Sequence, residues 1–382
     1  MINMAIPNLT GNEKKYLDNC IDSTFVSSVG EYVNCFEKMV ADSTGSMEAV
    51  ATSCGTTGIH AALTAVGVSY NDLVIIPSFT FIATANAIHH CGAEPWLMEI
   101  NKDDWCIDPF LVKRELATNC EKDDSGALIH KPSGKRVAAI MPVYTLGNIP
   151  NMHIFNDISK EYGVPLIVDA ACAIGAKFEG EDFGKLADLS ILSFNGNKTV
   201  TCGGGGAVVG NNDEMLQHVR HLTTTARVWP DYDFDEPGFN YRMTNIQAGV
   251  GVAQMERLND FVAVKRKVRK YYQKAFSGLQ SKGIGVFPTT DGASCWFSGI
   301  VMPEGSLLED SKAVCSKLKD AGIEARTFWK PIHLQKPYAN CPKTDTSFTD
   351  LLWQRIITLP CSTNISDEDL SVIDKTVNSI FS

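Results

Sequence analysis

Long apolar runs, closely paired cysteines and a positive net charge are all missing from this chain of 382 residues. No uncharged apolar run reaches the roughly 18 residues of a membrane-spanning helix, so we expect no association with a membrane. A net charge of −10 does not provide the basic surface that nucleic-acid phosphates require, which argues against nucleic acid as a partner. Internal repeats and low-complexity tracts are also missing.

The twelve cysteines include no CxxC pair and no Cys/His cluster with zinc spacing. They are scattered, mostly among apolar neighbours, which predicts reduced thiols in the core and no metal site. The first seven residues lack a basic region followed by an apolar stretch, so no signal peptide is evident. Together these features predict a cytoplasmic protein.

Hydrophobic residues make up 44% of the chain and charged residues 20%, which predicts a well-buried globular protein. Through the first two-thirds of the chain, short apolar runs alternate with helical patterns. Runs that are apolar throughout are typical of strands buried on both faces, as in a parallel sheet covered by helices on each side. We therefore predict an α/β fold with a mostly parallel sheet, formed by strands at 49–52, 74–76, 95–100, 137–141, 166–168, 189–192 and 207–209.

The pattern changes near residue 250. Residues 245–280 read as largely helical. The last hundred residues have fewer predicted strands, at 296–301 and 324–328, with helices near 308–319 and 367–380. This predicts a large domain over residues 1–250 and a smaller α+β domain over residues 251–382.

Lys198 lies between the apolar run 189–192 and the glycine run Gly203–Gly206. Burial of a lysine favours the neutral amine, and a neutral amine can form an imine with an aldehyde. Asp169 follows the apolar run 166–168, where a carboxylate suits a cationic pyridine ring. Taken alone, each residue is more often an ordinary surface or capping residue. The pair predicts a site for pyridoxal phosphate (PLP).

Residues 53–58, Ser-Cys-Gly-Thr-Thr-Gly, form a glycine-containing turn that leads into a helix. Backbone N–H groups at a helix start bind phosphate, although an ordinary capped turn has the same pattern. The turn lacks the ending of a nucleotide P-loop. Phe79 and Phe81 read singly as core aromatics, but a planar cofactor needs one such ring as a stacking surface.

These stretches together resemble the DegT-type family of nucleotide-sugar aminotransferases, PLP enzymes of fold type I with the fold of aspartate aminotransferase. The resemblance covers roughly residues 10–360. It rests on Cys54-Gly-Thr-Thr-Gly, Pro77-Ser-Phe-Thr-Phe, Val168-Asp-Ala-Ala, Ser193-Phe-Asn-Gly-Asn-Lys and Asn240-Tyr-Arg-Met-Thr-Asn, in family order and spacing.

The resemblance implies a role for each matching position. Lys198 would bind PLP covalently, Asp169 would pair with the ring nitrogen, and Phe81 would stack on the ring. Many members have glutamine near the ring hydroxyl where this chain has Cys172, and a thiol is a weaker hydrogen-bond donor than that amide. The phosphate would be held by the backbone at Thr56 and Thr57, by Ser193, and by Asn240 from the neighbouring subunit of a homodimer with shared active sites.

The resemblance further implies that L-glutamate donates an amino group to a nucleotide sugar. The branch that matches best acts on UDP-linked 4-keto-6-deoxy-N-acetylhexosamines, and dTDP- or GDP-linked keto sugars or an amino-cyclitol precursor are the alternatives. A deoxysugar dehydratase would carry histidine at position 198, and a non-catalytic module would lose Lys198 or Asp169. A thiol-dependent acyl transferase would use Cys54. The candidates for substrate binding are Arg227, Trp229, Arg242, Arg326, Trp329, Lys330 and His333.

Overall fold

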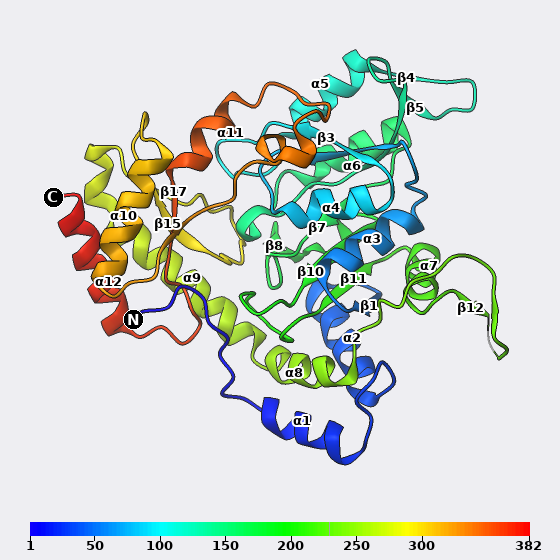
Figure 1. Ribbon diagram of the computed structural model, residues 1–382, viewed down its shortest axis with the longest axis horizontal. Helices are drawn as coiled ribbons and strands as arrows, with labels where there is room; N and C mark the ends of the chain where they lie inside the picture. Colours follow the sequence, from blue (N-terminus) through cyan, green and yellow to red (C-terminus); the bar gives the residue numbers. More distant parts are fainter. Residues whose placement is uncertain (229) are drawn as a thin grey trace.

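The computed structural model describes residues 1–228 and 230–382, so Trp229 lies outside the described residues. A seven-stranded sheet forms the centre of the larger half (Figure 1). Parallel bridges Ile140–Leu166 and Val143–Asp169 join its two hydrogen-bonded groups of strands. The spatial order is β1 (Glu48–Thr52), β11 (Gly206–Gly210), β10 (Leu189–Ser193), β7 (Ile167–Asp169), β6 (Lys135–Ile140), β2 (Leu73–Pro77) and β3 (Glu94–Met98).

Among these described strands, β11 alone runs in the direction opposite to all the others. Twelve residues, 194–205, separate β10 from β11. A parallel return would need a crossover, usually through a helix, so the chain instead returns beside β10 as an antiparallel strand. The prediction of an α/β fold with a mostly parallel sheet is confirmed, and Lys198 lies in the loop of this β10–β11 pair.

Helices cover both faces of the sheet and make it the middle of three layers. Side chains alternate along each strand, so in β2 Leu73 and Ile75 join one hydrophobic cluster while Val74 and Ile76 join another. This double burial explains why the strands read as apolar throughout. One face packs against α2 (Glu31–Thr44), α5 (Pro109–Asn119), α6 (Met152–Tyr162) and α8 (Asn245–Met255), and the other against α3 (Gly55–Ala65), α4 (Ile82–His90) and α7 (Asp213–Thr223).

The C-terminal half has its own antiparallel sheet and its own hydrophobic cluster. The long helix α9 (Leu258–Ala275) leads into it from the larger half (Figure 1). Its strands lie in the order β14 (Gly285–Val286), β15 (Ser298–Val301), β17 (Ile356–Leu359) and β16 (Arg326–Thr327), with the helices α10 (Leu308–Asp320), α11 (Ser347–Leu352) and α12 (Asp367–Ile380). Strand β17 was not predicted.

Residues at the N-terminus pack in this C-terminal half. Ile2 bridges Ile323, and the carbonyl of Met4 accepts a hydrogen bond from the Cys361 N–H at 2.7 Å. The division into domains 1–250 and 251–382 stays a prediction. None of the described helices is long and apolar enough to cross a membrane.

The remaining elements are short and peripheral. They are α1 (Glu13–Asp22) and the strand pairs β4 (Cys120–Lys122) with β5 (Leu128–His130), β8 (Lys177–Phe178) with β9 (Glu181–Asp182), and β12 (Arg227–Val228) with β13 (Asp233–Phe234).

Candidate active site

A cavity of about 470 Å³ lies between the carboxyl ends of the central strands and the C-terminal half. Asp169 ends β7, and Ser193 ends β10. The opposite wall comes from residues 296–297 and 326–329 of the C-terminal half. A larger groove of about 660 Å³ beside α2 and α9 contains neither Lys198 nor Asp169. The chemistry therefore points to the smaller cavity, at the edge of the sheet where parallel folds bind their ligands.

Asp169 is a buried carboxylate with two hydrogen-bond donors. Thr84 Oγ1 donates to its Oδ2 at 2.7 Å, and the Ala171 N–H donates to its Oδ1 at 3.1 Å. Burial raises the pKa of Asp169, and the bonds from Thr84 and Ala171 and the charge of Lys198 oppose that rise only partly. A cation placed against this carboxylate would favour its ionised form.

The Lys198 amine contacts the thiol of Cys172 and the indole ring of Trp296. Its Nζ donates to Cys172 Sγ at 3.3 Å and lies 4.0 Å from the centroid of the Trp296 ring. Trp296 is itself fixed, because its Nε1 donates to the Asn197 carbonyl at 2.9 Å. The amine therefore points into the cavity beside Cys172. Burial raises the pKa of the Cys172 thiol, so this side chain stays neutral and a weak hydrogen-bond donor.

The start of α3 provides a backbone cradle. Thr56 lines the cavity, whereas the hydroxyl of Thr57 turns back to the N-cap and accepts a hydrogen bond from the Cys54 N–H at 3.2 Å. The Cys54 sulfur in turn accepts from the Thr57 N–H at 3.5 Å. Cys54 thus serves as a helix cap at this position. A Cβ on Gly55 would lie 3.0 Å from Cβ of Ser193, so glycine allows the helix start to approach the end of β10.

Aromatic rings form one wall of the cavity. Phe81, the N-cap of α4, is 53% exposed and lines the cavity. Its ring centroid lies 6.1 Å from that of Trp329, which also lies 6.0 Å from Trp296. Phe79 is fully buried behind them, packed against Phe328 and Trp329. Phe79 is therefore a core residue, whereas Phe81 is available for stacking on a planar ligand.

Several predicted site residues do not line the described part of this cavity. Arg227 lies in the β12–β13 pair, with its guanidinium 4.0 Å from the centroid of the Tyr232 ring. His333 is buried between Ser78 and Asp350. The others are Thr57, Asn240, Arg242 and Lys330. Their proposed roles stay predictions.

Sequence reasoning missed three features of the site. Thr84 holds Asp169, Trp296 holds Lys198, and Asn197 anchors Trp296 through its carbonyl. Thr84 carried a readable signal, because it follows the proposed stacking residue by one helical turn. Trp296 is about a hundred residues from Lys198, and nothing in the local sequence connects them.

The residues of the cavity fit PLP. A buried carboxylate suits a protonated ring nitrogen, an amine in the same cavity suits the aldehyde, and an exposed phenylalanine offers a face for the ring. The start of α3 offers N–H groups to a phosphate, and Gly55 leaves the space that a side chain would fill.

Comparison with known proteins agrees with this reading. The model of the DegT/DnrJ/EryC1/StrS aminotransferase family matches residues 7–378. The GDP-perosamine synthase of Caulobacter vibrioides is 34% identical over 97% of this chain and 95% of its own length. The UDP-4-amino-4,6-dideoxy-N-acetyl-beta-L-altrosamine transaminase of Campylobacter jejuni is 28% identical over 92% of this chain and 90% of its own length.

A solved structure confirms the fold. The crystal structure of a DegT DnrJ EryC1 StrS aminotransferase from Brucella abortus covers 97% of this chain and 95% of its own, with a TM-score of 0.87 and 23% identity. The chain therefore belongs to the DegT/DnrJ/EryC1/StrS aminotransferase family and is a PLP-dependent aminotransferase of fold type I.

Proposed function

We propose that this chain transfers an amino group from L-glutamate to the 4-keto group of a nucleotide-linked 4-keto-6-deoxy sugar. The observation that carries the proposal is the presence of Lys198 and Asp169 on the walls of one cavity, with the exposed ring of Phe81 between α4 and the C-terminal half. When bound, PLP supplies an electron-withdrawing ring that stabilises negative charge on the α-carbon of the amino donor.

Three side chains of the cavity then have separate roles in the reaction. Asp169 keeps the ring nitrogen protonated, because the raised pKa of this buried carboxylate makes a cationic partner favourable. Lys198 Nζ moves a proton to and from the α-carbon of the donor. The ring of Trp296, 4.0 Å from that amine, shields it from water.

Arg326 is the candidate for binding an anion of the substrates. Among the described residues that line the cavity, Lys198 and Arg326 carry the positive charges. The side chain of Arg326 is 59% exposed, and its Nη2 lies 3.1 Å from Glu324 Oε1. The guanidinium is therefore accessible from solvent. We assign it to the donor carboxylate or the sugar diphosphate.

Two nucleotide classes remain candidates. The relative named as a GDP-perosamine synthase has the higher identity, 34%, which favours a GDP-linked sugar. The Campylobacter jejuni transaminase, at 28% identity, is named for a UDP-linked amino sugar. Its name favours the UDP-linked N-acetylhexosamine that the sequence motifs suggest. An incubation of the purified protein with PLP, L-glutamate and a panel of GDP-, UDP- and dTDP-linked 4-keto sugars separates them.

We expect one nucleotide class to yield an aminated sugar, identified by mass and NMR, with an equal amount of 2-oxoglutarate. No amination of any sugar in the panel would contradict the proposal, even if 2-oxoglutarate forms, because 2-oxoglutarate alone reports only the loss of the amino group from the donor. A matched incubation with Lys198→Ala controls for non-enzymatic amination.

We also propose a homodimer with shared sites, and a cytoplasmic location stays a prediction. Asn240 is exposed and bridges Thr224, outside the described lining of its own cavity. The nearby β12–β13 pair lies at the outer edge of the larger half (Figure 1). Both observations support a role of this segment in a partner subunit.

A further inference from the structure

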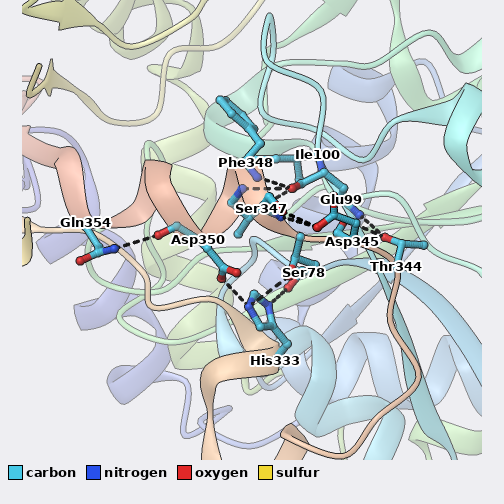
Figure 2. A network of polar contacts seen from close by, with 12 residues as sticks. Ser78, Glu99, Ile100, His333, Thr344, Asp345, Ser347, Phe348, Asp350 and Gln354 are labelled. Carbon is cyan, nitrogen blue, oxygen red and sulfur yellow. Dashed lines mark hydrogen bonds and ion pairs between the residues drawn. The ribbon is translucent and has the colours of Figure 1, made fainter. Parts of the chain in front are cut away.

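His333 is a buried member of a polar network that connects the two halves of the chain (Figure 2). Its side chain is 1% exposed. Nδ1 lies 2.5 Å from Ser78 Oγ, and Nε2 lies 2.6 Å from Asp350 Oδ1. A carboxylate only accepts, so in a neutral imidazole Nε2–H donates to Asp350 and Nδ1 accepts from the Ser78 hydroxyl. Both ring nitrogens are thereby used, and the histidine is not free to bind a substrate oxygen.

Ser78 lies at the start of the segment that carries one aromatic part of the cavity wall. It directly follows β2 and begins the four-residue segment that ends at Phe81, the N-cap of α4. Its carbonyl also accepts a hydrogen bond from the Ile332 N–H at 2.8 Å. Within the segment, Thr80 Oγ1 lies 3.0 Å from Thr84 Oγ1, the hydroxyl that holds Asp169. A shift of Ser78 would therefore be transmitted to both the stacking ring and the carboxylate.

His333 itself follows the other aromatic part of that wall. Phe328 and Trp329 come just before it, and their rings pack at a centroid distance of 4.2 Å. The bond between His333 and Ser78 therefore links the segment that carries Trp329 to the segment that carries Phe81.

Glu99 holds the far side of the network. Its Oε2 accepts hydrogen bonds from the N–H groups of Phe348 and Thr349 at the start of α11, at 2.8 and 3.1 Å. Figure 2 shows this contact next to Asp350, which belongs to the same helix and points toward His333. Because Glu99 follows β3, the larger half also anchors the carboxylate that orients the imidazole.

We propose that His333 is a positioning residue of the active site, which sets the spacing between Phe81 and Trp329 through its bond to Ser78. It does not touch the ligands of the cavity. The inference rests on the proposed site, since it assumes that PLP binds between these walls. The alternative is a buried histidine that contributes to stability alone.

Two amide substitutions separate the contacts of the imidazole. In His333→Asn the amide stands near the position of Nδ1 and retains the contact with Ser78. In His333→Gln it stands near the position of Nε2 and retains only the contact with Asp350. Ser78→Ala removes the same bond as His333→Gln, and it carries the test if the latter variant does not fold. His130, the last residue of β5, offers a matched control. It is buried, its Nδ1 lies 2.8 Å from Ser133 Oγ, and it does not line the cavity.

The measurements are the PLP dissociation constant, the separate kcat and KM values, and amide hydrogen exchange of residues 79–82 in the PLP-free protein. Since small misplacements in active sites have large effects, we expect His333→Gln and Ser78→Ala to weaken PLP binding about tenfold and to speed exchange of this segment. His333→Asn should stay within about twofold of the wild type, and His130→Gln should leave PLP binding unchanged.

Equal effects of His333→Asn and His333→Gln, or PLP binding and exchange unchanged in Ser78→Ala, would overturn the inference. Lys198→Ala distinguishes this failure from that of the proposed function. If PLP binding does not depend on Lys198, the proposed site is wrong, and the exchange of residues 79–82 still decides whether His333 positions the segment.

Discussion

At the scale of single residues, the site depends on Asp169, whose carboxylate is already buried before PLP binds. Asp169 is 5% exposed, and burial is the largest cause of its raised pKa. The folded protein therefore binds the Asp169 proton more tightly than the unfolded chain does. Ionisation of this group costs stability as the pH rises from the ordinary aspartate pKa through the raised value, and a bound ring cation offsets that cost.

Asp169→Asn should separate stability from function. Without PLP, the variant should unfold at a higher temperature than the wild type at neutral pH, and the difference should shrink toward acid pH, where the wild-type carboxyl is protonated. Turnover should fall by orders of magnitude, since an amide does not hold the ring nitrogen protonated. Thermal unfolding across pH and steady-state kinetics check both parts. Near wild-type turnover would show that another group holds the ring nitrogen.

The sequence allowed the prediction of Lys198 and Asp169 because each follows an apolar strand at the same edge of the sheet. The thiol of Cys172, which departs from the family pattern, lies 3.3 Å from Lys198 Nζ, a contact that the sequence did not predict. The roles of Thr84 and Trp296 were not predicted, because their contacts depend on how separate elements pack.

At the scale of elements, the β10–β11 pair and the start of α3 form one unit. One reason for glycine in a run such as Gly203–Gly206 is that it lets a ligand approach the backbone closely. The structure shows another reason at Gly206, where a Cβ would lie 2.5 Å from the carbonyl carbon and oxygen of Cys54. The absence of a side chain lets β11 approach the backbone that starts the helix.

Gly206→Ala should therefore displace the start of α3 and weaken PLP binding. Gly204→Ala is a matched control in the same run, since its Cβ would meet nothing nearer than the Gln247 amide at 3.5 Å. We expect about a tenfold larger PLP dissociation constant for Gly206→Ala and little change for Gly204→Ala, measured by titration of the PLP-free proteins. Equal values for the two variants would mean that this approach does not shape the cradle.

At the scale of the whole molecule, the layered architecture followed from sequence because the central strands are apolar on both faces. Strand β17 could not be predicted from the sequence, because Ile356–Leu359 directly follows helical turns and forms a strand by pairing with β15. The positions of Lys330 and His333 relative to the cavity depend on the packing of the C-terminal half, and that of Arg227 depends on the β12–β13 pair. Local sequence patterns report neither.

A shared-site dimer predicts that two inactive variants complement each other. Lys198→Ala and Asn240→Ala each disable the site, but a mixed dimer has one site with an intact lysine and an intact partner asparagine. Random exchange of subunits should restore about a quarter of wild-type activity. Activity that stays at the sum of the separate variants, despite confirmed subunit exchange, would place Asn240 outside a shared site.

The central claim is that the Lys198 amine binds PLP opposite the Asp169 carboxylate. The most direct measurement is an absorbance titration of Lys198→Ala with PLP, together with turnover and thermal unfolding. We predict that the absorbance band of lysine-bound PLP and the turnover are both lost while the unfolding transition is retained. A folded variant with normal turnover would contradict the claim.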